Sequence, residues 1–159
     1  MGAKSEALAK QFEAKVQEAT SVLDKLSDAD WKKVTAAEKW SVGVTAHHVA
    51  MAHAGIAGLI KSVASGQHKP SMTMDDLHAT NAQHAKDFAN VGKAETVALH
   101  KKNAAEAAAV VRGLDDAALA RSAEVLKGAP PMTAEQAVTN ILINHIEDHL
   151  GSIRKTVSA

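Results

Sequence analysis

The spacing of apolar residues is the feature that most limits what this chain can fold into. In several long stretches, apolar side chains recur at intervals of three and four residues, the period of one face of an α-helix. The first of these stretches contains Leu8, Phe12, Val16, Ala19 and Leu23 at this spacing. Aromatic residues make up 3% of the chain and there are three prolines, so there is little material for strands. We therefore predict an all-α protein.

Cap and turn signals divide the chain into four main helices. Thr133-Ala-Glu-Gln136 is a capping box for the last helix, and both Thr35-Ala-Ala-Glu38 and Ser41 offer start signals for the second. Glycines mark the breaks between segments. The helices are expected at about 5–26, from 35 or 41 to 66, at 73–90 continuing after a break over 94–112, and from 133 onward. Four such helices predict a four-helix bundle in one domain, residues 1–159.

The charge balance and the lack of cysteine narrow the range of partners. Eighteen Lys and Arg residues balance eighteen Asp and Glu residues, so the sequence lacks the positive field expected of a protein that binds nucleic acid or membranes. Without cysteine, any metal ion must be held by His, Asp or Glu. Charges are spread through the first residues, which predicts neither a signal peptide nor a membrane span and favours a cytoplasmic protein.

The last predicted helix places two histidines among its apolar residues. His145 and His149 are four residues apart, so both rings can point at one spot, in a stripe with Val138, Leu142 and Ile153. Such a pair can also lie on a helix surface or form hydrogen bonds in a core. A buried imidazole without a partner costs roughly 1–3 kcal/mol, however, and one metal ion satisfies both rings. We therefore predict that this pair binds a metal ion.

A third ligand is expected from another helix, because catalytic zinc-type sites usually have three protein ligands and one open position. The second predicted helix contains His47, His48 and His53. His48 is interpreted as the third ligand, because it shares a helix face with Val44, Met51, Ala52 and Leu59. His47 and His53 are expected to point outward or sideways, as solvated or hydrogen-bonded residues.

Other polar residues near these histidines are given simpler roles. Glu147 and Asp148 project away from the histidine stripe and are interpreted as solvated or interface residues. Asn144, with Asn140, either donates hydrogen bonds to the ligands or joins two helices. His100 is expected on a solvated face, and His78 and His84 are expected to line a pocket.

Two motifs together resemble those of the DinB/YfiT-like superfamily. In that superfamily a tryptophan-serine-valine start to the second helix is followed by a histidine before an apolar residue. Trp40-Ser-Val42 and His48-Val49 match this pattern. The superfamily also has a second pair of ligands, often His-x-x-x-His, near the end of the last helix, which His145 and His149 match. The resemblance extends over nearly the whole chain.

This resemblance implies an antiparallel four-helix bundle with one divalent ion near one end of its core. The implied ligands are His48, His145 and His149, with positions left open for water or a substrate group. The family includes metal-dependent hydrolases as well as transferases and isomerases that use mycothiol, bacillithiol or glutathione. The maleylpyruvate isomerase branch has a glutamate where this chain has His145, which argues against that one activity. The expected cofactor is a zinc, nickel or iron ion, with a low-molecular-weight thiol as cosubstrate on the transferase route.

Two classes of function follow from these observations. One is a metal-dependent enzyme that acts on a small molecule, as a hydrolase or a thiol S-transferase; the other is a non-catalytic metal-binding or dimerisation module. A structural site is normally closed by four protein ligands, and three are identified here, which favours the enzyme. Its reaction would use a metal-bound water or thiol, because no protein nucleophile stands out. The small residues Ala50, Ala54 and Gly58 predict a homodimer.

Overall fold

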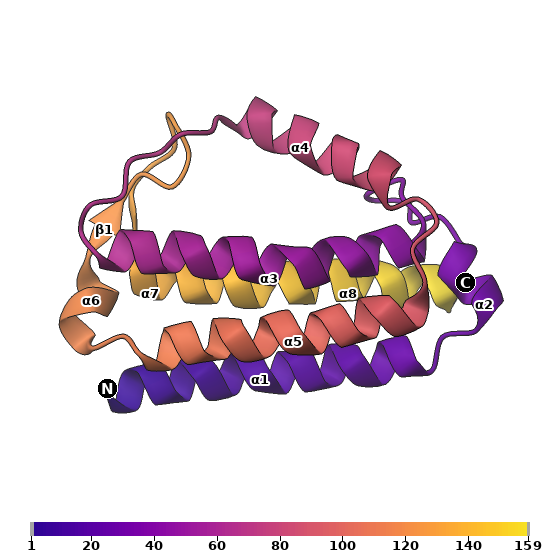
Figure 1. Ribbon diagram of the computed structural model, residues 1–159, viewed down its shortest axis with the longest axis horizontal. Coiled ribbons are helices and arrows are strands. Elements are labelled where there is room, and N and C mark those ends of the chain that lie inside the picture. Colours follow the sequence, from indigo (N-terminus) through magenta and orange to yellow (C-terminus); the bar gives the residue numbers. More distant parts are fainter. Residues whose placement is uncertain (1, 159) are drawn as a thin grey trace.

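Four long helices form the bundle in the computed structural model, which describes residues 2–158. The predicted domain 1–159 therefore extends one residue beyond the described part at each end. In Figure 1, α1 and α8 run in one direction along the bundle, and α3 and α5 run in the other. The long helices are α1 (Ala3–Asp24), α3 (Val42–Ala64), α5 (Lys93–Arg112) and a C-terminal helix made of α7 (Ala134–Ala137), η1 (Val138–Ile143) and α8 (Asn144–Val157). The prediction of an all-α four-helix bundle is confirmed.

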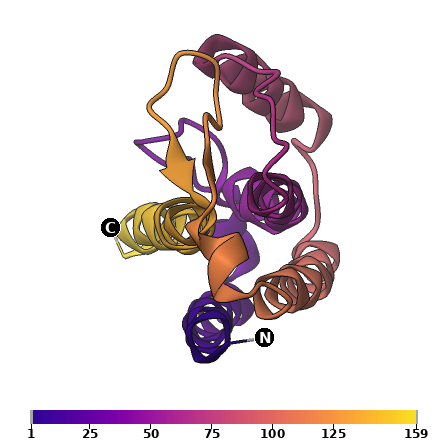
Figure 2. The ribbon, with the colours of Figure 1, turned by 90° about the vertical axis from the view of Figure 1, so that its left-hand side faces the viewer.

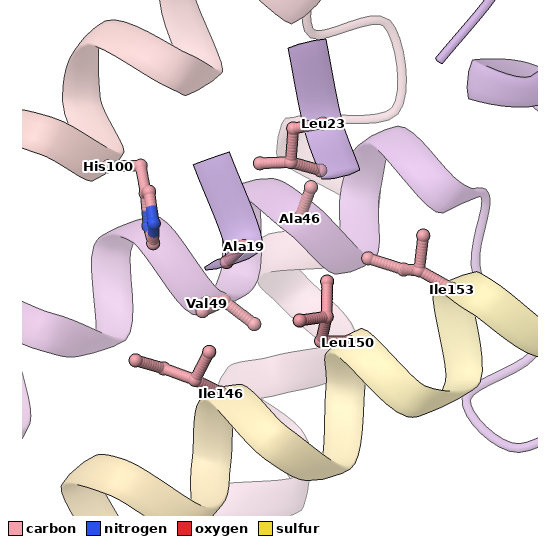
Figure 3. Close-up of a pocket in the computed structure, with 8 residues that line it drawn as sticks. All are labelled: Ala19, Leu23, Ala46, Val49, His100, Ile146, Leu150 and Ile153. Atoms are coloured by element: carbon pink, nitrogen blue, oxygen red, sulfur yellow. The ribbon is translucent and has the colours of Figure 1, made fainter. Parts of the chain in front are cut away.

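The helices surround a core in the order α1, α5, α3, α8, as the view along the bundle in Figure 2 shows. Side chains from all four meet at a cavity of only about 10 Å³ (Figure 3). A single water needs about that volume and two to four polar partners. His100 is the one polar side chain in the cavity wall, the rest being Ala19, Leu23, Ala46, Val49, Ile146, Leu150 and Ile153. The bundle is therefore close-packed and mostly apolar around this cavity.

The helix α4 (Met74–Asp87) connects α3 to α5 and lies outside the bundle, above α3 in Figure 1. Because it carries the chain back along the molecule, α3 and α5 can run in the same direction. None of the residues of α4 is fully buried. This helix therefore covers part of α3 without joining the core.

Cap residues account for most helix starts. Side-chain oxygens of Ser41, Thr73 and Thr133 accept hydrogen bonds from backbone N–H groups in the first turns of α3, α4 and α7. Of the two start signals for the second helix, Ser41 is the one used. The third predicted helix ends at Asp87, three residues early, and two short strands, β1 (Ser122–Ala123) and β2 (Met132–Thr133), form a hairpin that the sequence did not predict.

The C-terminal helix contains a π-helix, η1, immediately before the two histidines. Because a π-helix has wider turns, it shifts the register of the residues that follow. The buried stripe therefore runs through Val138 and Leu142 to Ile146, Leu150 and Ile153. The prediction that His145 and His149 belong to this stripe is wrong in this detail, since both lie beside it and are half-buried. They face α3.

A compact loop joins the short helix α2 (Asp28–Lys32) to α3. Its ends are held together because the Val42 N–H donates to the Lys33 carbonyl at 2.7 Å and the Thr35 N–H donates to the Trp40 carbonyl at 2.8 Å. Lys39 has a φ of 62°, in the left-handed region that non-glycine residues rarely adopt. The loop places Glu38 against α8.

Close contact between α2 and α3 fixes the start of α3. The indole of Trp31 lies so close to Gly43 that a Cβ atom there would overlap the ring, and its Nε1 donates to the Val91 carbonyl at 2.9 Å.

Another short helix, α6 (Asp116–Ala120), lies at the end of the bundle opposite to α2 (Figure 1). Within residues 2–158, no helix has the length and apolar character needed to cross a membrane.

Candidate metal centre

The three predicted ligands meet between α3 and α8. The ring centroid of His48 lies 4.8 Å from that of His145 and 5.0 Å from that of His149, and the two rings on α8 are 4.5 Å apart. One ring nitrogen of each histidine lies within 4.8 Å of the others. Nitrogens that bind one tetrahedral ion at about 2.0–2.1 Å are roughly 3.4 Å apart. The arrangement therefore fits a single ion with small side-chain adjustments.

The direction of the ring nitrogens also fits an ion. Nε2 of His48 lies 2.9 Å from Nε2 of His145, so two imidazole nitrogens point at the same small space. Nδ1 of His145 is buried and has no hydrogen-bond partner among the described residues. The polar interactions of His145 are therefore all directed toward the cluster.

Burial keeps the two innermost imidazoles neutral. Desolvation, with smaller contributions from His145 and His149, lowers the pKa of His48 to about 3. Desolvation, followed by the effect of His149, lowers the pKa of His145 to about 4. A histidine binds a metal ion through the lone pair of its neutral form. Both rings are therefore in the form that binds metal at neutral pH.

Glu38 orients the third histidine. His149 Nδ1 lies 3.2 Å from Glu38 Oε1, and the Ser152 hydroxyl donates to Glu38 Oε2 at 2.7 Å. Burial raises the pKa of the Glu38 carboxyl, but hydrogen bonds from Ser152, His149 and Thr35 together outweigh that effect and lower it. An ionised carboxylate can only accept, so Nδ1 of His149 donates to Glu38 and Nε2 is the ring nitrogen left for the cluster.

The sequence did not identify Glu38 as a site residue. It was interpreted as part of a capping box with Thr35, but α3 begins later, at Val42. The structure instead places Glu38 in the loop that precedes α3, with only 9% of its side chain exposed. The one available signal in the sequence was the position of Glu38 two residues before Trp40. In the structure, the ring of Trp40 lies edge-on to that of His48, with their centroids 5.2 Å apart.

Replacing Glu38 with alanine is expected to weaken metal binding by roughly 10–100-fold, the usual cost of losing a group that orients a ligating histidine. Glu38→Gln should lose less, because its amide oxygen still accepts the His149 proton. Competition with a chelator measures both affinities, and circular dichroism checks folding. Glu147→Gln is the matched control, since Glu147 lies on α8, the helix of His149, but is exposed and pairs with Lys15. Equal affinity in Glu38→Ala and wild type would contradict this role.

Two further histidine pairs lie beside the centre, and His84 is the one member of these pairs that is not fully buried. Nδ1 of His47 lies 2.8 Å from Nε2 of His84, and Nε2 of His53 lies 3.0 Å from Nδ1 of His100. The prediction that His100 is solvated is wrong, since His100 is buried. His47 and His53 are buried too, so of the two roles expected for them, solvated or hydrogen-bonded, the structure shows the second. The reason is that α3 is covered by α4, α5 and α8, so every residue from Val42 to Ala50 is buried.

The remaining predicted polar residues lie away from the cluster. Asn140 and Asn144 are exposed, so neither supports the histidines from the core side. Glu147 and Asp148 are exposed as predicted. His78 is also exposed, whereas His84 lines a pocket of about 490 Å³ whose wall includes His48 and His145. Two of the three clustered histidines, His48 and His145, therefore open onto a space large enough for a small molecule.

Comparison with known proteins identifies relatives of this chain. The sequence profile of the DinB superfamily matches residues 11–153. No match was found among curated protein sequences. YfiT from Bacillus subtilis, described as "a probable metal-dependent hydrolase with an unusual four-helix bundle topology", is a similar structure with a TM-score of 0.74 at 20% identity. The match covers 98% of this chain and 85% of YfiT.

Two structures of the mycothiol-dependent maleylpyruvate isomerase have the same fold. Their TM-scores are 0.75 and 0.74 at 12% and 13% identity, and each match covers 96% of this chain. This chain spans only 63% of the length of the isomerase. At sequence identities of 12–20%, these structural similarities establish the fold of this chain.

Proposed function

Because the chain belongs to the DinB superfamily, we propose that it is a metal-dependent enzyme that acts on a small molecule. It binds one divalent ion, zinc, nickel or iron, through His48, His145 and His149. The reaction is either a hydrolysis or the transfer of a group to a low-molecular-weight thiol. The structurally similar proteins are described as a metal-dependent hydrolase and a mycothiol-dependent isomerase, which supports both routes.

The convergence of three histidines, two of which line a pocket, is the observation that carries this proposal. Three protein ligands leave at least one position of a tetrahedral ion free, and His48 and His145 both lie in the pocket wall. A site that only stabilised the fold would normally be closed by a fourth ligand. The open position favours an enzyme over a structural metal site.

The ion and the chain have separate tasks in this proposal. A divalent ion held there would polarise an oxygen or sulfur ligand and lower its pKa. Glu38 holds the proton on Nδ1 of His149 and so keeps that ring in its binding orientation. On the pocket wall, Asn81 offers hydrogen bonds, and His84, paired with His47, can exchange a proton with a bound molecule. The chain has no cysteine, so a thiol must come from the cosubstrate.

Activity screens on matched preparations test the proposal. Protein loaded with zinc, nickel or iron is assayed against ester and amide libraries, and against electrophiles with mycothiol, bacillithiol or glutathione. We expect turnover in one arm that disappears when the ion is removed and returns when it is restored. Full activity in the metal-free protein would refute the mechanism. Metal binding without turnover in any arm would favour the alternative, a non-catalytic metal-binding module.

A homodimer and a cytoplasmic location stay predictions. The expected dimer contact was a face of small residues on α3, but Ala50 is buried within the bundle, where its carbonyl accepts from Asn103 Nδ2 at 3.0 Å. Only Ala54 and Gly58 of that face are exposed. A dimer would therefore need a different or wider contact, and light scattering at high protein concentration would measure its mass.

A further inference from the structure

The pocket beside the three histidines is elongated. Its wall on α3 extends from His48 to Leu59, which is about 16 Å of helix at 1.5 Å per residue. The opposite wall is formed by α4, from Leu77 to His84, and η1 contributes Ile141. Figure 1 shows α4 slanting above part of α3. The histidine cluster lies toward the His48 end, and most of the pocket extends away from it.

The wall of this pocket is apolar along most of its length. Of its lining residues within the described 2–158, none is Asp, Glu, Lys or Arg. The polar groups are histidines, Ser71, Thr80 and Asn81, all of which are hydrogen-bonding and carry no fixed charge. The larger apolar side chains in the wall include Met51, Ile56, Leu59, Leu77, Leu126 and Ile141.

These features restrict what the pocket can bind. A charged group in the body of a ligand would lose water and find no opposite charge in the wall, which is strongly unfavourable. At the cluster end, in contrast, an ion held by imidazole rings alone would keep its positive charge and attract an electron-rich group. The cluster end of the pocket therefore favours an electron-rich group, and the rest of the pocket favours an uncharged one.

We propose that the pocket takes an elongated small molecule with an uncharged, apolar body and a single metal-binding group directed at the histidine cluster. This inference rests on the proposed metal site and names the substrate class for it. Dicarboxylates and other molecules with a second charge are excluded as substrates, because that charge would lie against apolar side chains. The preferred ligand fills the pocket from His48 toward Leu59.

Two glycines on α3 offer a matched pair of variants. Gly55 lies in the pocket wall, and a Cβ atom built on it would meet nothing within 4 Å. Gly58 is equally open but lies outside the pocket wall. Both are inside a helix, where replacing glycine favours the helix. Gly55→Phe should therefore fill the pocket without disturbing the backbone, and Gly58→Phe should add the same ring elsewhere on the same helix.

The proposal that the pocket binds an apolar ligand body is tested first, on protein stripped of metal. The probe is N-phenyl-1-naphthylamine, a neutral apolar fluorophore whose emission rises in apolar surroundings. We expect one probe per chain in wild type and in Gly58→Phe, and at least tenfold weaker binding in Gly55→Phe. Circular dichroism verifies that each variant is folded. Absence of binding to wild type, or equal binding to both variants, would overturn the apolar pocket.

The orientation of the ligand, with its metal-binding group at the histidine cluster, is tested on zinc-loaded protein. The probes are straight-chain alkyl hydroxamates, which bind metal through one end. Calorimetry should show about fourfold tighter binding per added methylene until the pocket is full. A hydroxamate of equal length that ends in a carboxylate should bind at least tenfold more weakly. Affinity that is independent of chain length, or unaffected by the terminal carboxylate, would overturn the inference. Failure to load zinc, nickel or iron at the cluster would overturn the proposed function and the orientation together, while the fluorophore result would still decide the apolar pocket.

Discussion

Replacing His149 with alanine is expected to abolish metal loading and turnover together. The three histidines are the only protein ligands proposed, so the variant leaves two imidazoles to hold the ion. The loss of affinity should exceed the roughly 10–100-fold that accompanies loss of an orienting partner such as Glu38. The fold should survive, because His149 is half-buried and lies beside the buried stripe of α8.

Metal content of protein purified without a nickel column measures this effect. Wild type and His149→Ala are compared after dialysis against zinc and removal of the unbound ion. His78→Ala is the matched control, because His78 is an exposed histidine on α4 outside the cluster. We expect a full complement of metal in wild type and the control, and little or none in His149→Ala. Unchanged loading in His149→Ala would show that the ion binds elsewhere.

Removing the ion from wild type is expected to lower the thermal stability of the bundle. An ion that binds only the folded chain stabilises it by mass action, by about 2.7 kcal/mol when its free concentration is 100 times the Kd. For a chain of this size, each kcal/mol shifts the melting temperature by roughly 2–4 °C. Scanning calorimetry of metal-loaded and chelator-treated protein should therefore show a difference of about 5–11 °C.

The same scan distinguishes binding at the cluster from binding elsewhere. The ion connects α3 with α8, which are far apart in the sequence, so its effect should appear as a shift of the whole transition. His149→Ala should melt at the same temperature with and without added zinc. A shift in that variant as large as in wild type would mean that the stabilising ion does not depend on this histidine.

Helix periodicity and cap residues were sufficient to predict the bundle. Thr73 and Thr133 begin the helices that their capping patterns predicted, and the breaks near Gly66, Gly92 and Gly113 lie at helix ends. These signals are local, because a cap or a turn depends on residues within a few positions. The residues that start and end these helices can therefore be found in the sequence itself.

Features that depend on tertiary contacts could not be predicted in the same way. The π-helix before His145 moves the buried stripe onto Ile146, and no residue pattern marked that change of register. His53 and His100 are buried as a hydrogen-bonded pair because two helices distant in sequence meet there. The role of Glu38 likewise depends on a loop that brings it to α8. Each case needs knowledge of which segments pack together.

Anomalous diffraction from crystals soaked in zinc tests the central claim most directly. The proposal predicts one strong peak between α3 and α8, at about 2.0–2.1 Å from a ring nitrogen of each of His48, His145 and His149. The same peak should be missing from crystals of His149→Ala. A strong peak at another group of side chains, or no peak at the cluster while zinc binds elsewhere, would contradict the assignment of these three histidines as the metal site.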